Sequence, residues 1–227
     1  MIFNVVRNET RDRYNEVIIL LNHITSLEPN SPTELPSSEV KILRGLVFVH
    51  IYAAFEKSIN EIVQKTLLGA SALNVQYNHC ILPFSSISAN NKLKAFKTCG
   101  YKNFFPKVSE LFETISSKDM ATIQETIFAN DLQNVWYKTI VEIRRSFGMK
   151  SLRFDPRVRT TIDEVVDKRN AIAHGRESAI TVGSNFDSNE IREKLTIVQN
   201  FNDSMIDEFE DYLVKKKFIK PAVRRNY

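Results

Sequence analysis

The sequence contains few of the residues that interrupt helices, with 6 Gly and 7 Pro among 227 residues. An all-β fold with many tight turns needs more of both, so this scarcity favours long helices. No segment approaches the roughly 20 consecutive apolar residues that cross a bilayer, and we expect no membrane association. The first residues lack a basic segment followed by an apolar one, so we expect no secretory signal and a cytoplasmic protein.

Cysteine is equally scarce, with only Cys80 and Cys99 in the chain. In a protein expected to stay in the cytoplasm, two cysteines predict reduced thiols rather than a disulfide. His79 stands beside Cys80, but no further histidine or cysteine follows at the spacing of metal ligands. The sequence therefore predicts no metal site.

The chain carries a net charge of +4 and has a pI of about 9.0. This mild positive excess permits binding to a polyanion without requiring it. Residues 215–227 form a basic tail with six basic residues and no acid, and residues 144–159 hold six basic residues and one acid. A solvated surface and contacts to phosphate both stay open as interpretations. The basic residues of the first stretch are Arg144, Arg145, Lys150, Arg153, Arg157 and Arg159.

Apolar residues recur at spacings of three and four along much of the chain, which is typical of amphipathic helices. A loop is expected at residues 28–36, because three prolines in this segment make it stiff. The predicted helices cover residues 3–27, 38–68, 132–147, 156–175 and 191–212.

Capping residues mark several of the expected helix ends. Asp155 followed by Pro156 is a start signal, because an acid can cap the helix and proline fits its first position. Gly175 is a stop signal for the same helix. Asp187, with Glu190 three residues later, resembles a capping box before the last helix.

Amphipathic helices must bury their apolar faces against one another. We therefore expect an all-α protein, a four-to-five-helix up-and-down bundle that forms a single domain over residues 1–227. Residues 69–128 are expected to form an irregular, partly helical insertion after the second helix, with a brief helix beginning at Pro106. Residues 179–182 are expected to be extended.

Arg169, Asn170 and His174 concentrate more reactive chemistry than any other part of the chain. Arginine offers a forked cation for phosphate oxygens, histidine can move a proton near neutral pH, and asparagine can orient either group. Such a set suits attack of a ribose 2′-hydroxyl on its own 3′-phosphate. On a helix, Asn170 and His174 share a face, whereas Arg169 lies about 140° away from His174. If they act together, the last turn must loosen or a second copy must supply part of the set, as an isologous dimer would.

The spacing of arginine and histidine is weakly specific, because Arg44 and His50 form a similar pair in the second predicted helix. We assign Arg44 and His50 to the core, since the residues between them are apolar apart from one glycine. Tyr101, Phe104 and Phe105 are likewise assigned to the core rather than to a platform on which bases stack.

Structural roles for the three motif residues also stay open from the residues alone. His174 fits a cap at the end of a helix, where it would meet the helix dipole. Arg169 fits a salt bridge to a nearby acid such as Asp163 or Glu164. Asn170 fits a capping or packing amide.

The segment 169–175, Arg-Asn-Ala-Ile-Ala-His-Gly, resembles the signature of the HEPN superfamily. This signature consists of an arginine, a polar residue that is often asparagine, a few more residues and then a histidine. Residues 44–57 resemble the second helix of small bacterial HEPN proteins, with an acid at Glu56. Three further segments resemble the approach to the motif in the RiboL-PSP-HEPN group, namely residues 130–134, residues 147–149 and the helix after Pro156.

The resemblance implies a helical bundle that dimerises through the motif helices and needs no metal ion or other cofactor. Many HEPN proteins are endoribonucleases in toxin–antitoxin, CRISPR-associated or phage-defence systems, so an antitoxin or defence-system protein would be a partner. Carried over residue by residue, Arg169 and His174 would be catalytic, Asn170 would support them, and Glu56 would be a fourth member. The basic residues that we expect to contact RNA are Lys168, Arg176, Lys215, Lys216 and Lys217.

We therefore expect a dimeric, metal-independent endoribonuclease of a toxin or phage-defence type, which cuts RNA by 2′-hydroxyl attack. The alternative is a non-catalytic HEPN module that binds nucleotide, RNA or a partner protein in a regulatory or antitoxin-paired role. A helical scaffold without a nucleic-acid role is a third hypothesis.

Overall fold

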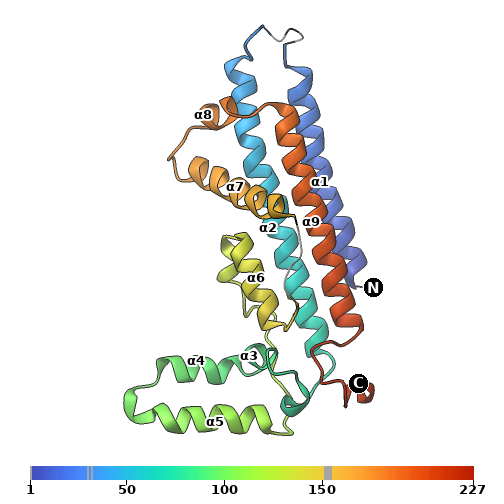
Figure 1. The fold of residues 1–227 in the computed structure, drawn as a ribbon, viewed down its shortest axis with the longest axis vertical. Helices are drawn as coiled ribbons and strands as arrows, with labels where there is room; N and C mark the ends of the chain where they lie inside the picture. Colours follow the sequence, from blue (N-terminus) through green and yellow to red (C-terminus); the bar gives the residue numbers. More distant parts are fainter. Residues whose placement is uncertain (1, 30, 32, 151–154) are drawn as a thin grey trace. The chain divides into compact units, whose positions relative to one another are not determined.

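The computed structural model describes residues 2–29, 31, 33–150 and 155–227. In this part of the chain the protein is helical and has no β-strand, which confirms the predicted all-α class. The longest helices are α1 (Ile2–Ser26), α2 (Ser38–Ser71), α7 (Pro156–Ala173) and α9 (Ser188–Val214). The shorter helices are α3 (Ser85–Ser88), α4 (Asn90–Thr98), α5 (Phe104–Ser116), α6 (Tyr137–Ser146) and α8 (Ala179–Ser184) (Figure 1). None of the described helices is long and apolar enough to cross a membrane.

The chain divides into two compact units, each built from three segments. Unit 1 consists of Met1–Glu61, Leu132–Tyr137 and Arg153–Ile206. Unit 2 consists of Ile62–Asp131, Lys138–Leu152 and Asp207–Tyr227. Both α2 and α9 therefore contribute residues to each unit. Asn30 and Pro32 of the predicted loop and Arg153 of the first basic stretch lie outside the described residues.

Unit 1 is organised around α1 and the parts of α2 and α9 that belong to it. The Asn202 amide in α9 donates to the Tyr14 hydroxyl in α1 at 2.7 Å, within the core. Arg13 in α1 donates through both terminal nitrogens to Glu61 in α2, at 2.8 and 2.7 Å. The fully buried aromatic rings of this core are Tyr14, Tyr52, Phe48, Phe55 and Phe201.

Helix α8 approaches α2 closely because glycine stands at both contact positions. A Cβ atom on Gly45 in α2 would collide with the carbonyl group of Ala179. A Cβ atom on Gly183 in α8 would collide with the carbonyl group of Lys41. The two backbones therefore touch where any larger residue would push them apart.

The extended conformation that we predicted for residues 179–182 is wrong, because these residues form most of α8. The Ser178 hydroxyl accepts from the N–H of Thr181 at 3.2 Å and so caps the start of this short helix. The predicted capping box before α9 is confirmed. The N–H of Asp187 donates to the Glu190 carboxylate and the N–H of Glu190 donates to the Asp187 carboxylate, both at 2.8 Å.

The helix predicted for residues 132–147 begins too early, since α6 starts only at Tyr137 and a separate short 3-10 helix, Asp131–Gln133, contains Leu132 and Gln133. The Leu132 carbonyl accepts from the Asn60 amide at 3.1 Å. The N–H of Val135 donates to the Tyr52 hydroxyl at 3.0 Å. Side chains of α2 thus form hydrogen bonds with the backbone of this segment.

Arg44 and His50, both assigned to the core, differ in the structure. Arg44 is buried, as predicted, and pairs with Glu28 at 2.6 Å. The prediction is wrong for His50, whose side chain is 35% exposed and lies with Nε2 3.7 Å from the Glu16 carboxylate. This contact places the imidazole at the solvent edge between α1 and α2.

Unit 2 contains α3, α4 and α5, so residues 69–128 are partly helical as predicted. Helices α4 and α5 pack against each other as a hairpin, and α5 begins two residues before Pro106. The core assignment of Tyr101, Phe104 and Phe105 at the hairpin turn is wrong, because all three are exposed. Other rings fill the core of unit 2 and leave the turn outside it. These rings are Phe84, Phe147, Tyr212 and Phe218.

Replacing Gly183 with alanine is expected to lower the free energy of unfolding by about 2 kcal/mol, because the new methyl group meets backbone rather than a flexible side chain. Gly100→Ala is the matched control, since nothing lies within 4 Å of the position of its Cβ. The control should leave the thermal midpoint unchanged or raise it slightly. Thermal denaturation followed by circular dichroism measures both variants. Equal midpoints for the two would contradict the close approach of α8 to α2.

Candidate functional site

The motif residues lie at the C-terminal end of α7, in unit 1. The helix starts as predicted: Pro156 occupies the first position, and the Asp155 carboxylate accepts from the N–H of Arg157 at 2.9 Å. One face of α7 is buried, and its packing fixes the direction in which the motif side chains of the last turn point. The apolar residues of this buried face are Ile162, Val165, Val166 and Ala171.

Helix α7 ends in a turn that depends on Gly175. The N–H of Arg176 donates to the Ala171 carbonyl at 2.8 Å, and the N–H of Gly175 donates to the Ile172 carbonyl at 3.2 Å. This pair of bonds is the Schellman motif, which needs a residue in the left-handed conformation. Gly175 supplies it with a φ of 70°. His174 is therefore the C-cap, fixed between the helix and the glycine turn.

The side chain of Arg169 is held by three neighbours. Its Nη1 donates to Oδ1 of Asn170 at 2.7 Å, and its Nη2 donates to Oε2 of Glu56 at 3.2 Å. The guanidinium also lies over the ring of Tyr52, with Cζ 3.9 Å from the ring centroid. Only 20% of the Arg169 side chain is exposed. These contacts fix its position on the side of α7 that faces α2.

Asp163 and Glu164, the two acids that the sequence suggested as partners of Arg169, do not pair with it. Asp163 pairs with Arg159 at 3.6 Å, and Glu164 pairs with Lys194 at 2.7 Å. The partner of Arg169 is instead Glu56, which α2 supplies from a distant part of the sequence. The fold thus brings together two of the residues that the family resemblance had selected.

Asn170 connects the motif to the segment before α6. Its side chain is buried, and its Nδ2 donates to Oδ1 of Asn134 at 3.3 Å. The side-chain oxygen Oδ1 of Asn170 accepts from Arg169, so both the oxygen and the nitrogen of the side-chain amide form hydrogen bonds. Sequence reasoning did not select Asn134 or Tyr52 as site residues. The one available signal was the position of Tyr52 four residues before Glu56, which puts both on one face of α2.

Burial sets the protonation properties of the Tyr52 and Glu56 pair. Loss of solvent raises the pKa of the Glu56 carboxyl above its ordinary value, and the charge of Arg169 and hydrogen bonds from Arg169 and Tyr52 oppose this rise only in part. Burial also raises the pKa of the Tyr52 hydroxyl to about 12. Tyr52 therefore stays protonated near neutral pH and acts as a hydrogen-bond donor to Glu56.

The imidazole of His174 is exposed and makes no hydrogen bond or ion pair with any residue that the structure describes. Only its backbone N–H is bound, to the Asn170 carbonyl at 3.0 Å. The capping role therefore belongs to the backbone of His174 and leaves the ring free. A single chain thus brings Arg169, Asn170 and Glu56 together without a contact from any of their side chains to the imidazole.

Lys168 and Arg176, two of the residues expected to contact RNA, flank the end of α7. Lys168 pairs with Glu177 at 3.2 Å, and Arg176 pairs with Asp167 at 2.9 Å. The Arg176 pair is largely exposed, and such pairs contribute little free energy. A phosphate group can therefore compete with the Asp167 carboxylate for Arg176.

The three lysines expected to contact RNA in the basic tail belong to unit 2. Lys215 and Lys217 share one acid, Asp211, and each ammonium lies 2.5 Å from a carboxylate oxygen. Lys216 adopts a left-handed backbone conformation with a φ of 48°. Two of the three positive charges are thus close to a negative charge from α9.

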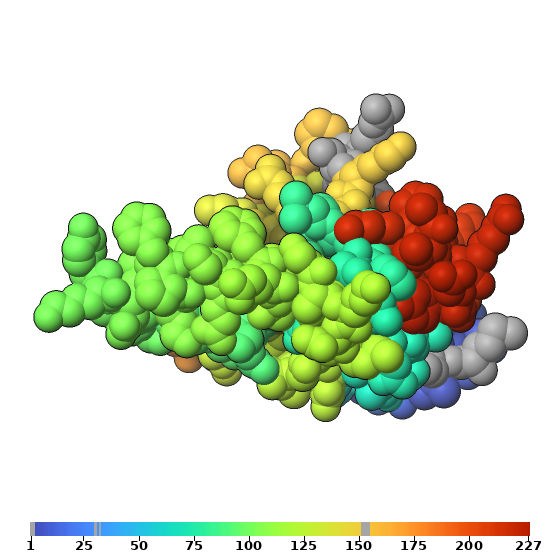
Figure 2. Space-filling view, turned by 90° about the horizontal axis from the view of Figure 1, so that it is seen from below, coloured from blue at the N-terminus to red at the C-terminus, as the bar shows by residue number. Residues whose placement is uncertain are grey.

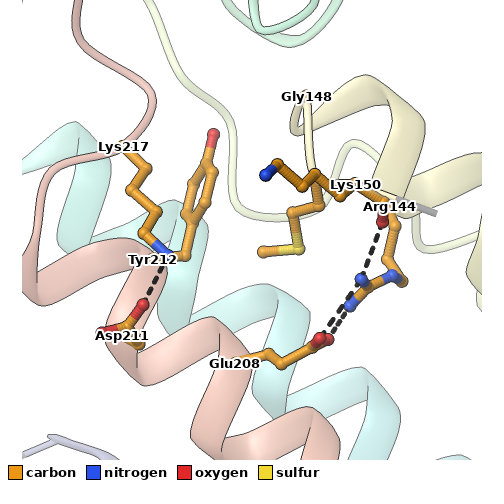
Figure 3. A pocket seen from close by; sticks show the side chains of 8 residues that line it. Arg144, Gly148, Lys150, Glu208, Asp211, Tyr212 and Lys217 are labelled. Atoms are coloured by element: carbon orange, nitrogen blue, oxygen red, sulfur yellow. Dashed lines mark hydrogen bonds and ion pairs between the residues drawn. The ribbon is translucent and has the colours of Figure 1, made fainter. Parts of the chain in front are cut away.

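Unit 2 also contains a pocket of about 500 Å³ that collects basic residues from both predicted stretches (Figure 3). Arg144 and Lys150 come from the first stretch, and Lys217 comes from the tail. Two carboxylates lie among them, because Arg144 pairs with Glu208 and Lys217 pairs with Asp211. The lining is therefore close to neutral and makes a weak site for an anion.

No three metal-binding side chains lie close enough together to hold a metal ion in the described part of the chain. Cys80 and Cys99 are free thiols, and Cys80 is buried in unit 2. Burial raises the pKa of the Cys80 thiol to about 11, so it stays protonated and unreactive near neutral pH.

A comparison with models of protein families finds a match to RiboL-PSP-HEPN over residues 8–211. The matched region contains Glu56, Asn134 and the whole of α7, and it ends before the basic tail. No curated protein and no solved structure matches the chain significantly.

Glu56→Gln is expected to change how stability depends on pH. Because the pKa of Glu56 is raised in the folded protein, its stabilising effect is fully present below the ordinary value of 4.5 and is lost as pH rises through the raised value. Glutamine mimics the protonated form, so the variant should gain stability relative to wild type between about pH 4 and about pH 7. Denaturant unfolding at both pH values measures the difference. The control is Glu113→Gln, at an exposed carboxylate on α5, and a Glu56 variant that matches this control contradicts the assigned shift.

Proposed function

The chain belongs to the RiboL-PSP-HEPN family, and we propose that it is an endoribonuclease that cuts RNA without a metal ion. The reaction is attack of a ribose 2′-hydroxyl on the adjacent phosphate. The observation that carries this proposal is the arrangement at the end of α7. Arg169 is fixed by Asn170, Glu56 and Tyr52, while the imidazole of His174 is exposed and free.

The proposed roles follow from the chemistry of each side chain. His174 removes the proton from the 2′-hydroxyl, since histidine can accept and donate a proton near neutral pH. Arg169 stabilises the negative charge that develops on the phosphate. Its guanidinium has five N–H donors, and Asn170 and Glu56 bind only one each in the described contacts, so further donors remain for phosphate oxygens.

Atoms balance without a cofactor in this reaction. The 2′-oxygen forms a bond to phosphorus, the bond from phosphorus to the 5′-oxygen breaks, and a proton passes to that 5′-oxygen. The products are a 2′,3′-cyclic phosphate and a 5′-hydroxyl. Asn170 acts as a positioning residue. Its side chain accepts a hydrogen bond from Arg169, and its backbone carbonyl accepts one from the backbone N–H of His174.

A second copy of the chain is part of the proposal. Arg169 and His174 lie about 140° apart around the helix axis, and the Arg169 side chain is turned toward α2. An isologous dimer through the ends of two α7 helices would place the free His174 of each copy near the Arg169 of the other. A toxin or phage-defence role in the cytoplasm, with an antitoxin or defence-system protein as partner, also belongs to this proposal and rests on the family alone.

The second candidate function is a non-catalytic module that binds nucleotide, RNA or a partner protein. The ion pair of Arg169 with Glu56 favours it, because this pair neutralises the charge that a phosphate would need. A wild-type protein that binds RNA but does not cut it, across varied substrates, would support this candidate.

Incubation with total RNA in the presence of EDTA tests the nuclease. Wild type should cut, and both His174→Ala and Arg169→Ala should lose about 10²-fold or more in rate, because each removes proton transfer or charge stabilisation. His23→Ala and Arg159→Ala are the matched controls, at exposed positions in α1 and α7. Both controls should cut at the wild-type rate.

Full cleavage by the His174 or Arg169 variant would contradict the proposed site. Loss of wild-type cleavage in EDTA would contradict the metal-independent reaction. Size-exclusion chromatography with light scattering shows whether each variant keeps the oligomeric state of wild type, which separates loss of chemistry from loss of assembly.

A further inference from the structure

We propose that the turn of the α4–α5 hairpin binds single-stranded RNA, with bases stacked on Tyr101 and Phe105 and phosphates held by three lysines. The lysines are Lys94, Lys97 and Lys102. This inference rests on the proposed function in one respect, because it takes RNA as the ligand of the protein. The surface that it concerns is the green one in Figure 2.

The hairpin is held together by contacts between its two helices. Helices α4 and α5 pack along each other, and the rings of Phe96 and Phe104 meet near the turn with centroids 5.1 Å apart. Lys92 in α4 and Lys107 in α5 both bind the Glu110 carboxylate, at 2.5 and 2.7 Å. These contacts hold the two helices in register on either side of the turn.

The aromatic residues at the turn present free ring surfaces. Tyr101 is 93% exposed and Phe105 is 73% exposed. The rings of Phe105 and Phe104 form a T-shaped pair, with centroids 5.3 Å apart and planes 89° apart. Any of the four nucleobases can stack on such a ring, because every base has a π-surface. Binding of this kind does not depend on the RNA sequence.

The charge around these rings is suited to a polyanion. Residues 62–109 contain six lysines and no aspartate or glutamate. Lys94, Lys97 and Lys102 are exposed, and they have no acidic partner among the residues that the structure describes. Unlike Lys215 and Lys217, they therefore carry their full charge toward solvent.

The kind of apolar residue favours RNA over a membrane or an apolar groove of another protein. Between residues 90 and 116, every large hydrophobic residue that is exposed is aromatic. Leucine, isoleucine and valine in this segment are at least partly covered. Insertion into lipid or into an apolar groove uses aliphatic chains as readily as rings, whereas stacking on bases requires rings.

The test measures RNA binding by full-length protein that carries His174→Ala, so that the RNA stays intact. The probe is a fluorescent single-stranded RNA of about 12 nucleotides, a length within the usual site size, and the readout is fluorescence anisotropy. The double change Tyr101→Leu and Phe105→Leu keeps apolar side chains but removes both rings, and it should weaken binding by about tenfold or more. Tyr101→Phe keeps the ring and should bind like the parent.

The lysines are tested through the dependence of affinity on salt. Changing Lys94, Lys97 and Lys102 to glutamine should lower the slope of log affinity against log salt by about 2, since each lost phosphate contact on a single strand removes about 0.7. Lys118→Gln and Lys138→Gln are the controls at exposed lysines elsewhere in unit 2. Each control should leave the slope unchanged.

Three outcomes overturn the proposal: RNA binding that the leucine changes leave intact, a slope that the three glutamines leave unchanged, or attachment to phosphatidylserine vesicles in place of RNA. The nuclease is judged separately. Binding that depends on the rings, in a protein whose wild type never cuts RNA, supports this inference and contradicts only the nuclease. Cleavage that needs His174, together with binding that ignores Tyr101 and Phe105, does the reverse.

Discussion

The guanidinium group of Arg169 donates to Asn170 and to Glu56 and lies over the ring of Tyr52. This arrangement ties α7 to α2, and through the bond from Asn170 to Asn134 it also ties both helices to the segment before α6. The carboxylate of Glu56 is half-buried, and without the arginine it would be a charge in poor solvent. The charge of Arg169 offsets part of this cost, and the contacts of Arg169 with Glu56 and Tyr52 fix the orientation of the last turns of α7.

That orientation decides what the end of α7 offers to a ligand. The Schellman turn at Gly175 stops the helix immediately after His174 and leaves the imidazole exposed. One helix therefore carries two reactive groups that face different directions. In the proposed function two copies of the chain act together for this reason. The α7 helix of one copy can place its His174 near Arg169 of the other copy, which a single α7 helix cannot do with its own pair.

Local chemistry was sufficient to predict the elements whose ends depend on neighbouring residues. The cap at Asp155, the stop at Gly175 and the capping box of Asp187 and Glu190 all follow from residues a few positions apart. The wrong predictions concern segments whose conformation or exposure depends on residues far away in the sequence. Side chains of α2 bind the backbone of Leu132 and Val135 where a continuous helix was predicted, and the exposure of Tyr101 depends on which rings fill the core of unit 2. The same limit applies to the site, since Tyr52 contacts Arg169 and Asn134 contacts Asn170 only in the folded chain.

In the proposed function, one copy of the chain holds only part of the reactive set. The most direct test is the rate of RNA cleavage per protomer, measured over a wide range of protein concentration, beside light scattering that reports the oligomeric state. If two copies complete the site, the rate per protomer rises with concentration and levels off where the dimer is fully formed. A rate per protomer that stays constant under conditions where the protein is monomeric would contradict it.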